Sequence, residues 1–331
     1  MDEKSGDIKP EGIKKKDITS PVIEDIKSKL PKIAFKQDEP LKSYTSFKVG
    51  GPVRAIFFPD NAADLTQVLR ILNENRITPF IMGNGSNILA SDERLELVVV
   101  NTLGLNNIEL IDEKTSVNID EKNETTTDIK AEAGALLSNL AVFACENGLS
   151  GLEFAYGIPG TLGGAVVMNA GAYGGEMKDV VLNTTAYNME TGIYTLTAAE
   201  NEFSYRHSRF LRTGDVVISS TIRLQKSDKE SIKQKMEELS AKRRESQPLD
   251  LPSGGSTFKR PSKGYAAALI EQAGLKGFTT GGAQVSEKHA GFIVNRGDAT
   301  YKDIMAVIKH VQEVVLEKFN TRLELEVKVV K

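Results

Sequence analysis

Residues 157–175 read GIPGTLGGAVVMNAGAYGG, and this stretch decides how the chain can fold. Nine of the chain's 28 glycines fall between residues 148 and 175. Because glycine carries no side chain, the backbone of such a segment can lie directly against another group, and the Thr, Asn and Tyr side chains between the glycines can hydrogen bond to it. The composition favours a flat ligand ring with polar edges, although a glycine-rich turn packed tightly on a helix would have the same composition.

A second small-residue segment, Gly83-Asn84-Gly85-Ser86-Asn87, precedes the first by about 75 residues and lies between the strand-like runs PFIM and LELVVV. Its backbone N–H groups could surround a pyrophosphate, or the segment could be a plain tight turn. Ile88 stands where the third glycine of a Rossmann fingerprint would be, and the chain has no GxxxxGK[ST] loop. Taken together, the two segments indicate one extended nucleotide cofactor on a different fold.

Strand and helix patterns alternate through the first two thirds of the chain. AIFF, from Ala55, begins a strand–helix–strand pattern, and Asn61 with Asp64 predicts the start of its helix. A second helix is expected over about 136–147, after a polar segment, 113–130, that predicts a surface hairpin or loop. Strand-like runs then follow the glycine-rich segment, namely VVLNTTAYN, IYTLT and VVISSTIRL.

A charged helix is expected around 231–245. The region of about 250–331 after it reads as a separate α+β unit, in which a helix begins at Thr300 with an apolar stripe along one face. The final run, RLELEVKVV, alternates in polarity and predicts a strand with Glu326 on its polar face.

Composition argues against several classes of partner and site. The 42 Lys and Arg residues nearly balance 45 Asp and Glu, so binding to nucleic acid through bulk charge is not expected. A single cysteine, Cys145, rules out an intrachain disulfide framework and fits a reducing compartment. The three histidines, His207, His289 and His310, lack metal-binding spacing, so no metal site is predicted.

The chain also lacks the sequence features of a membrane or exported protein. No apolar run approaches the ~18–20 residues that a membrane-spanning helix needs. The first residues, MDEKSGDIKP, contain no hydrophobic stretch of the kind found in a secretory signal. We therefore expect a cytoplasmic protein without a membrane partner.

Three polar residues are candidates for chemistry, each with an ordinary alternative. Arg206, in YRHSRF, could clamp a carboxylate with two hydrogen bonds, or could be a surface arginine. Ser256, in SGGSTFKRP, has an accessible hydroxyl, or is a turn serine; its neighbours do not form a hydrolase GxSxG elbow. Glu326 could act as an acid, or could be a solvated surface carboxylate.

In their order along the chain, several segments resemble the UDP-N-acetylenolpyruvoylglucosamine reductase family over about residues 40–330: SYTSFKVGGP, GNGSNIL, YGIPGTLGGAVVMNAGAYGGE, YRHSRF, GGSTFKRP, HAGFIVN and LELEV. The resemblance implies an α+β fold in which a two-part FAD-binding region of the vanillyl-alcohol-oxidase type precedes a smaller substrate-binding domain. On this plan residues 1–20 form a mobile tail, 21–225 the FAD-binding region and 226–331 the substrate-binding domain.

The resemblance also implies an activity. Members of the family are NADPH-dependent flavoenzymes that reduce the enolpyruvyl group of UDP-N-acetylenolpyruvoylglucosamine to the lactyl ether of UDP-N-acetylmuramate. The reaction belongs to peptidoglycan precursor synthesis, and hence to cell-wall formation, cell shape and cell division. It implies bound FAD, with NADPH and the UDP-linked enolpyruvyl sugar as substrates. Hydride would pass from FAD N5 to C3 of the enolpyruvyl group, and a proton from Ser256 to C2.

Residue roles carry over by motif. Arg206, Ser256 and Glu326 match the family's catalytic arginine, serine and acid. The first glycine segment would hold the FAD pyrophosphate and the second would line the flavin, through Gly83, Asn84, Gly85, Ser86, Asn87, Pro159, Gly160, Thr161, Gly163, Gly164 and Ala165. On the substrate side the candidates are Tyr173, Arg243, Lys259 and Arg260.

Two departures and two alternatives accompany this hypothesis. The connection from Arg206 to Ser256 is too short for the extra tyrosine-bearing loop of one branch, so the chain resembles the branch without it. Arg260 stands where an asparagine is common in the family. The alternatives are an FAD-dependent hydroxy-acid oxidase or dehydrogenase on the same flavin fold, and a non-catalytic flavin-binding sensor.

Overall fold

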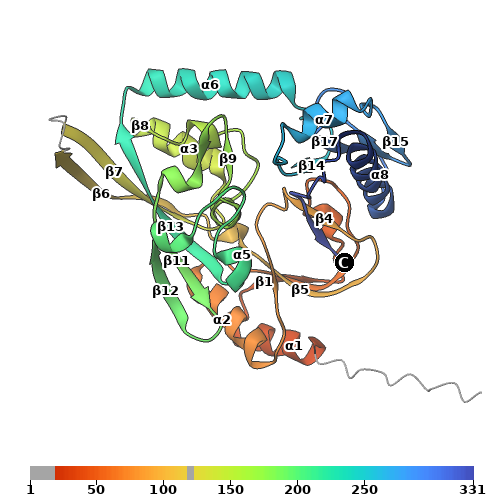
Figure 1. The fold of residues 1–331 in the computed structure, drawn as a ribbon. Helices are drawn as coiled ribbons and strands as arrows, with labels where there is room; N and C mark the ends of the chain where they lie inside the picture. The colour runs from red at the N-terminus through yellow and green to blue at the C-terminus, as the bar shows by residue number, and fades with distance from the viewer. Residues whose placement is uncertain (1–18, 118–122) are drawn as a thin grey trace, which may run out of the picture.

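The computed structural model describes residues 19–117 and 123–331, in three units of sheet and helix that follow one another along the chain (Figure 1). Residues 1–18 of the predicted tail lie outside the described residues. Thr19 and Ser20, the last two residues assigned to that tail, instead begin helix α1 (Thr19–Lys29). The helix forms because Val22, Ile23 and Ile26 fall on one face and are buried there.

The first unit is a four-stranded sheet with two helices on it. The strands lie in the order β1 (Ala34–Gln37), β2 (Val53–Phe58), β5 (Leu95–Asn101) and β3 (Phe80–Met82). Helix α2 (Ala62–Glu74) starts where the sequence predicts, because Asn61 Oδ1 accepts a hydrogen bond of 2.8 Å from Asp64 N. The apolar faces of α1 and α2 share one core with residues of β2 and β5.

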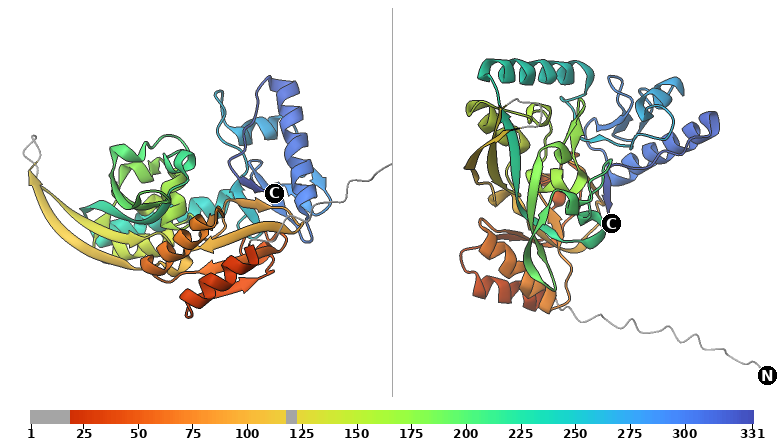
Figure 2. Two further views of the ribbon diagram at one scale, coloured as in Figure 1. Left: turned by 90° about the horizontal axis from the view of Figure 1, so that it is seen from below. Right: turned by 60° about the vertical axis from the view of Figure 1, so that its left-hand side comes forward.

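The second unit is a larger sheet in which all the described strand pairs are antiparallel. Its main path runs in the order β12 (Gly192–Thr197), β11 (Val181–Asn188), β13 (Val216–Lys226), β7 (Asn123–Glu132) and β6 (Ile108–Val117), with β8 (Leu149–Ser150) paired to β13. The polar segment 113–130 falls mostly on β6 and β7, which pair antiparallel as the predicted hairpin; residues 118–122 lie outside the described residues. Figure 2 shows this hairpin as a long curved ribbon that extends away from the rest of the sheet.

Helices α3 (Leu137–Glu146) and α4 (Leu162–Met168) contribute to the core of the second unit. Helix α3 agrees with the prediction over about 136–147. Helix α4 was not predicted, because its two glycines have low helix propensity. Leu162, Ala165 and Val166 are nevertheless buried in this core, so packing stabilises a helix that local propensity disfavours.

Helix α6 (Lys229–Ser246) connects the second unit to the third (Figure 1). It begins just after the predicted domain boundary at residue 226, yet Ile232 and Met236 pack into the core of the second unit. The third unit is a four-stranded sheet with two helices: β14 (Ser253–Ser256), β17 (Phe292–Asn295), β16 (Ala283–Val285), β15 (Thr279–Thr280), α7 (Ala266–Gln272) and α8 (Tyr301–Phe319).

Three short elements complete the region between α4 and β13. Strands β9 (Gly171–Ala172) and β10 (Gly175–Glu176) pair antiparallel as a small ribbon, and helix α5 (Phe210–Thr213) follows further along the chain. The ribbon lies at the end of the glycine-rich stretch. It therefore places backbone groups of that stretch close to the residues before α5.

The end of the chain returns to the first unit. Of the predicted strand RLELEVKVV only β18 (Lys328–Val330) forms, and it pairs in parallel with β4 (Ile88–Ala90), directly after the first glycine segment. An isolated bridge joins Leu325 to Phe258 in the third unit. The observed strand is shorter than the predicted one, because the two halves of the segment pair with different units. Glu326 lies between the two halves.

No helix within residues 19–117 and 123–331 combines the length and the hydropathy that a bilayer-spanning segment requires.

Candidate active site

The two glycine segments lie in contact with each other. Asn84 Nδ2 donates a hydrogen bond of 2.7 Å to Pro159 O. A Cβ atom on Gly83 would lie only 2.3 Å from Thr161 Oγ1, so the loops can approach this closely only because residue 83 is a glycine. Two segments about 75 residues apart in sequence therefore form one backbone surface.

The residues of this surface fit FAD. Within the described part of the chain, the backbone N–H groups of Asn84, Gly85 and Ser86 donate to no protein acceptor, so they are free for a pyrophosphate. A Cβ on Gly164 would meet only Thr161 Oγ1 within 4 Å, at 3.6 Å, which leaves open backbone for a flat ring. The donors and the open backbone match the two chemically different parts of the cofactor.

A cavity of about 290 Å³ adjoins the same surface. Its wall includes Leu136, which forms a β-bridge with Thr161 of the second glycine segment. No motif in the sequence marked the lining, which comprises Leu103, Asn106, Ile108, Gly134, Ala135, Leu136 and Asn139. The cavity could not be found from the sequence, because its wall is formed by two stretches, 103–108 and 134–139, that meet only in the folded chain.

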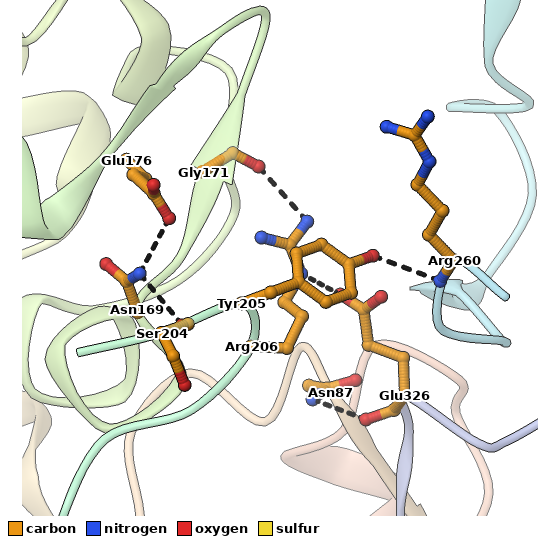
Figure 3. A network of polar contacts seen from close by, with 9 residues as sticks. All are labelled: Asn87, Asn169, Gly171, Glu176, Ser204, Tyr205, Arg206, Arg260 and Glu326. Atoms are coloured by element: carbon orange, nitrogen blue, oxygen red, sulfur yellow. Dashed lines mark hydrogen bonds and ion pairs between the residues drawn. The ribbon is translucent and has the colours of Figure 1, made fainter. Parts of the chain in front are cut away.

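Arg206 and Glu326 meet across 120 residues of sequence (Figure 3). Arg206 Nε lies 2.6 Å from Glu326 Oε1, and a terminal guanidinium nitrogen donates to Gly171 O at 3.2 Å. Their side chains are 21% and 14% exposed. The alternatives of a surface arginine and a solvated surface carboxylate are therefore wrong. For Glu326 the sequence pattern could not show this, because alternation in the last strand identifies a polar face but not what covers it.

The environment shifts the acidity of Glu326. Burial raises the pKa of its carboxyl above the ordinary value, and the Arg206 guanidinium opposes that rise by attraction and hydrogen bonding. Asn87 Nδ2 donates to Glu326 O at 3.1 Å, so the last residue of the first glycine segment holds the backbone of this acid.

Ser256 lies at the end of β14, next to the segment that carries Glu326. Glu326 N donates to Thr257 O at 2.9 Å, which places the backbone of Ser256 beside that segment. The residue before it, Gly255, has φ of +77°, a conformation that favours glycine. Ser256 is exposed, and its hydroxyl has no hydrogen-bond partner among the described residues.

The proposed substrate-side residues fall into two pairs. Arg243 packs against Gly157, its Cδ 2.9 Å from where a Cβ on that glycine would be; burial lowers the pKa of Arg243, and Tyr173 opposes this by charge attraction. In the third unit, Lys259 Nζ lies 3.6 Å from Glu324, and the Arg260 guanidinium lies 4.2 Å from the centre of the Tyr265 ring. The first pair therefore lies at the second glycine segment, and the second pair lies in the third unit.

Two residues at the site were not singled out from the sequence. Tyr205 lies next to Arg206, and its hydroxyl accepts a hydrogen bond of 3.0 Å from Arg260 N, linking the second and third units (Figure 3). Asn169 is fully buried beside the same turn. In the sequence, only their positions pointed to them: Tyr205 directly precedes Arg206, and Asn169 lies within the glycine-rich stretch 157–175.

Comparison with known proteins matches two family models. The FAD binding domain model covers residues 53–197, and the model for the UDP-N-acetylenolpyruvoylglucosamine reductase C-terminal domain covers residues 247–330. The predicted α+β fold class, with an FAD-binding region of the vanillyl-alcohol-oxidase type before a smaller domain, is confirmed.

Proteins named UDP-N-acetylenolpyruvoylglucosamine reductase align over most of the chain. The one from Caldanaerobacter subterraneus subsp. tengcongensis is 47% identical over 88% of this chain and 92% of its own length. The one from Clostridioides difficile is 45% identical over 91% and 94%, respectively. The crystal structure of the Thermus caldophilus enzyme aligns with a TM-score of 0.72 and 30% identity, covering 91% of this chain and 99% of that one.

We expect Glu326→Gln to become more stable relative to the parent protein as the pH rises from about 4 to about 7. A carboxyl with a raised pKa in the folded state contributes stability that is complete below its unfolded pKa and is lost as the pH rises through its folded pKa. Glutamine does not titrate. Urea unfolding across this pH range measures the difference in free energy of unfolding between variant and parent.

Glu324→Gln is the matched control, because that side chain is 73% exposed in the same segment. It should show no such trend. A pH-independent difference for Glu326→Gln would contradict the raised pKa.

We expect Gly164→Ala to fold normally but to lose flavin. Alanine is more favourable than glycine in a helix by about 1 kcal/mol, and the added methyl has room in the protein. It would, however, occupy the space proposed for the ring. The ratio of flavin to protein absorbance after purification should drop at least about tenfold while the melting temperature of the flavin-free protein is kept.

Gly83→Ala provides the contrast, because its Cβ would collide with Thr161 and should lower stability and flavin content together. Full flavin content in Gly164→Ala would show that no cofactor lies against this helix.

Proposed function

The chain belongs to the UDP-N-acetylenolpyruvoylglucosamine reductase family, and from this premise we propose that Arg206, Ser256 and Glu326 carry out the reaction with NADPH as reductant. The protein is an FAD-dependent oxidoreductase of peptidoglycan precursor synthesis. Identity over most of the chain favours this function over a hydroxy-acid oxidase or a flavin sensor. The contact of 2.6 Å between Arg206 and Glu326, beside the glycine segments, carries the assignment of residues.

The substrate is a UDP-linked sugar with an enolpyruvyl ether, and the product carries a lactyl ether. The reaction adds a hydride to C3 and a proton to C2 of the enolpyruvyl group. When bound, FAD would supply the hydride, with NADPH as its source. The protein's own task is to bind the carboxylate of the substrate, stabilise the charge that develops beside it and deliver the proton.

Arg206 binds the carboxylate of the enolpyruvyl group. Negative charge spreads into this carboxylate as the reaction proceeds, so a fixed cation interacts more strongly with the transition state than with the substrate. Glu326 and Gly171 O already hold the guanidinium in place. The orientation is thus established before substrate binds, and no reorganisation is needed during the reaction.

Glu326 limits repulsion near the developing enolate. Its pKa is raised by burial, so it can hold a proton more readily than an exposed glutamate, and a protonated carboxyl can donate a hydrogen bond to the enolate oxygen. While ionised, it is neutralised by Arg206. In either protonation state, Glu326 therefore adds no uncompensated negative charge beside the substrate.

Ser256 donates the proton to C2. A serine hydroxyl is a weak acid in water, so it needs close positioning beside a strongly basic carbon. Its exposure and its lack of a competing hydrogen-bond partner among the described residues support this role.

The remaining assignments follow the same proposal. Tyr173, Arg243, Lys259 and Arg260 bind the UDP part of the substrate, because a diphosphate requires cations and hydrogen-bond donors. Residues 21–225 serve as the FAD-binding region and residues 226–331 as the substrate-binding domain. The enzyme works in the cytoplasm, in agreement with its single, buried and unpaired cysteine, Cys145.

We expect Ser256→Ala to separate the two half-reactions. Removing the hydroxyl eliminates the proton donor without touching the glycine segments, so NADPH should still bleach the flavin. Reoxidation by the UDP-enolpyruvyl sugar should slow at least about 100-fold. Anaerobic stopped-flow absorbance measures both steps.

Ser253→Ala, in the same strand, is the control and should reoxidise like the parent protein. Equal slowing of both half-reactions in Ser256→Ala would refute the proton-donor role.

We expect Arg206→Lys to lose roughly 100-fold or more in the rate of reoxidation. An ammonium group keeps the charge but cannot make a two-pronged contact with a carboxylate while also bonding to Glu326. Arg212→Lys is the control, because that arginine lies on α5 with an exposed side chain paired to Glu202. Turnover unchanged in Arg206→Lys would mean that another group binds the carboxylate.

A further inference from the structure

Asn169 lies fully buried at the centre of a polar network next to Arg206 (Figure 3). Its Oδ1 accepts a hydrogen bond of 2.9 Å from Lys178 N. Its Nδ2 donates to Glu176 Oε2 at 2.6 Å and to Ser204 O at 3.0 Å. A backbone N–H can only donate, and a carbonyl or carboxylate oxygen only accepts, so these partners determine the orientation of the amide.

The amide joins the two parts of the backbone that hold Arg206. Ser204 O belongs to a tight turn in which Ser204 and His207 exchange two backbone hydrogen bonds, and Arg206 lies within that turn. Glu176 belongs to the β9–β10 ribbon, where it pairs with Gly171. Gly171 O in turn accepts from the guanidinium. One side chain therefore connects the turn that carries the arginine to the ribbon that receives it.

The backbone of Arg206 needs such support. Its φ is +51°, in the left-handed region that long side chains rarely adopt. A residue in this conformation persists only where the surrounding contacts hold it. The turn is anchored by the Asn169 amide at Ser204 O, two residues before the arginine.

We propose that Asn169 is a positioning residue for Arg206, fixing the turn against the β9–β10 ribbon so that the guanidinium meets both Glu326 and the substrate carboxylate. This inference rests on the proposed function. The ordinary alternative is that Asn169 merely caps helix α4, since its own φ is +43° and asparagine is common in that conformation. A cap of this kind uses the backbone, so glycine would serve equally well.

Asn169→Gly separates the two roles, because glycine keeps the left-handed cap but removes the amide. We expect the kcat for reduction of the UDP-enolpyruvyl sugar to fall roughly 10- to 100-fold, as for a misplaced catalytic group. Reduction of the bound flavin by NADPH, in which the proposed function gives Arg206 no part, should keep its rate. Asn320→Gly, at the exposed end of α8 with φ of +48°, is the matched control and should retain both rates.

The double variant Asn169→Asp with Glu176→Gln tests the contact to Ser204 separately. The glutamine introduced in the ribbon can donate to the aspartate introduced after α4 and restore that hydrogen bond in the opposite direction. Ser204 O loses its side-chain donor and keeps only the backbone N–H of His207. We expect the melting temperature to recover relative to Asn169→Asp alone while the kcat stays low. A purely structural role predicts recovery of both.

A readout independent of turnover is the ¹⁵Nε NMR signal of Arg206 in the flavin-bound protein, which reports its hydrogen bond to Glu326. We expect this signal to shift in Asn169→Gly and in the double variant but not in Asn320→Gly. An unshifted signal with unchanged kcat in Asn169→Gly would overturn the inference, as would recovery of kcat in the double variant. If the parent protein itself, once reduced, is not reoxidised by the sugar, the proposed function fails, and the NMR signal still tests the positioning.

Discussion

The parallel pairing of β18 with β4 brings the end of the chain back to the first glycine segment, and the geometry of the site depends on it. Lys328 N donates to Asn87 O at 2.9 Å, and Asn87 Nδ2 donates to Glu326 O at 3.1 Å. These bonds fix the acid relative to the first glycine segment, in which the backbone N–H groups of residues 84–86 donate to no acceptor among the described residues. Without them Glu326 would remain with the third unit, and its carboxyl would have no defined relation to the second glycine segment or to Arg206.

The Arg206–Glu326 pair is better understood as preorganisation than as a source of stability. Both side chains are largely buried, and the desolvation of two charges offsets much of their attraction. A guanidinium has five N–H donors, and within the described residues that of Arg206 has only two hydrogen-bond acceptors, Glu326 and Gly171. Donors of the guanidinium therefore stay available, so the pair orients the arginine without consuming its capacity to bind.

Patterns in the sequence predicted helix starts well. They predicted less well the elements whose formation depends on contacts with distant parts of the chain. The helix starts at Asn61 and Thr300 were predictable, because each cap involves residues three apart. Helix α4 was missed because burial of Leu162 and Val166 in the core of the second unit overrides two glycines. The final strand was predicted too long, because its extent depends on the three residues of β4, which no pattern in the strand itself reveals.

The same distinction explains what could be predicted of the site. The resemblance implies roles for Arg206, Ser256 and Glu326, because each lies within a short motif that can be matched along the sequence. The burial of Glu326 depends on Arg206, 120 residues away, and could not follow from alternation in one strand. Asn169 has partners 7, 9 and 35 residues away and no chemistry of its own, so only the folded backbone reveals it. A strained turn that presents a reactive side chain must be held by hydrogen bonds from residues far away in the sequence. Residues that make such bonds are the hardest part of a site to predict, because no short motif contains both partners.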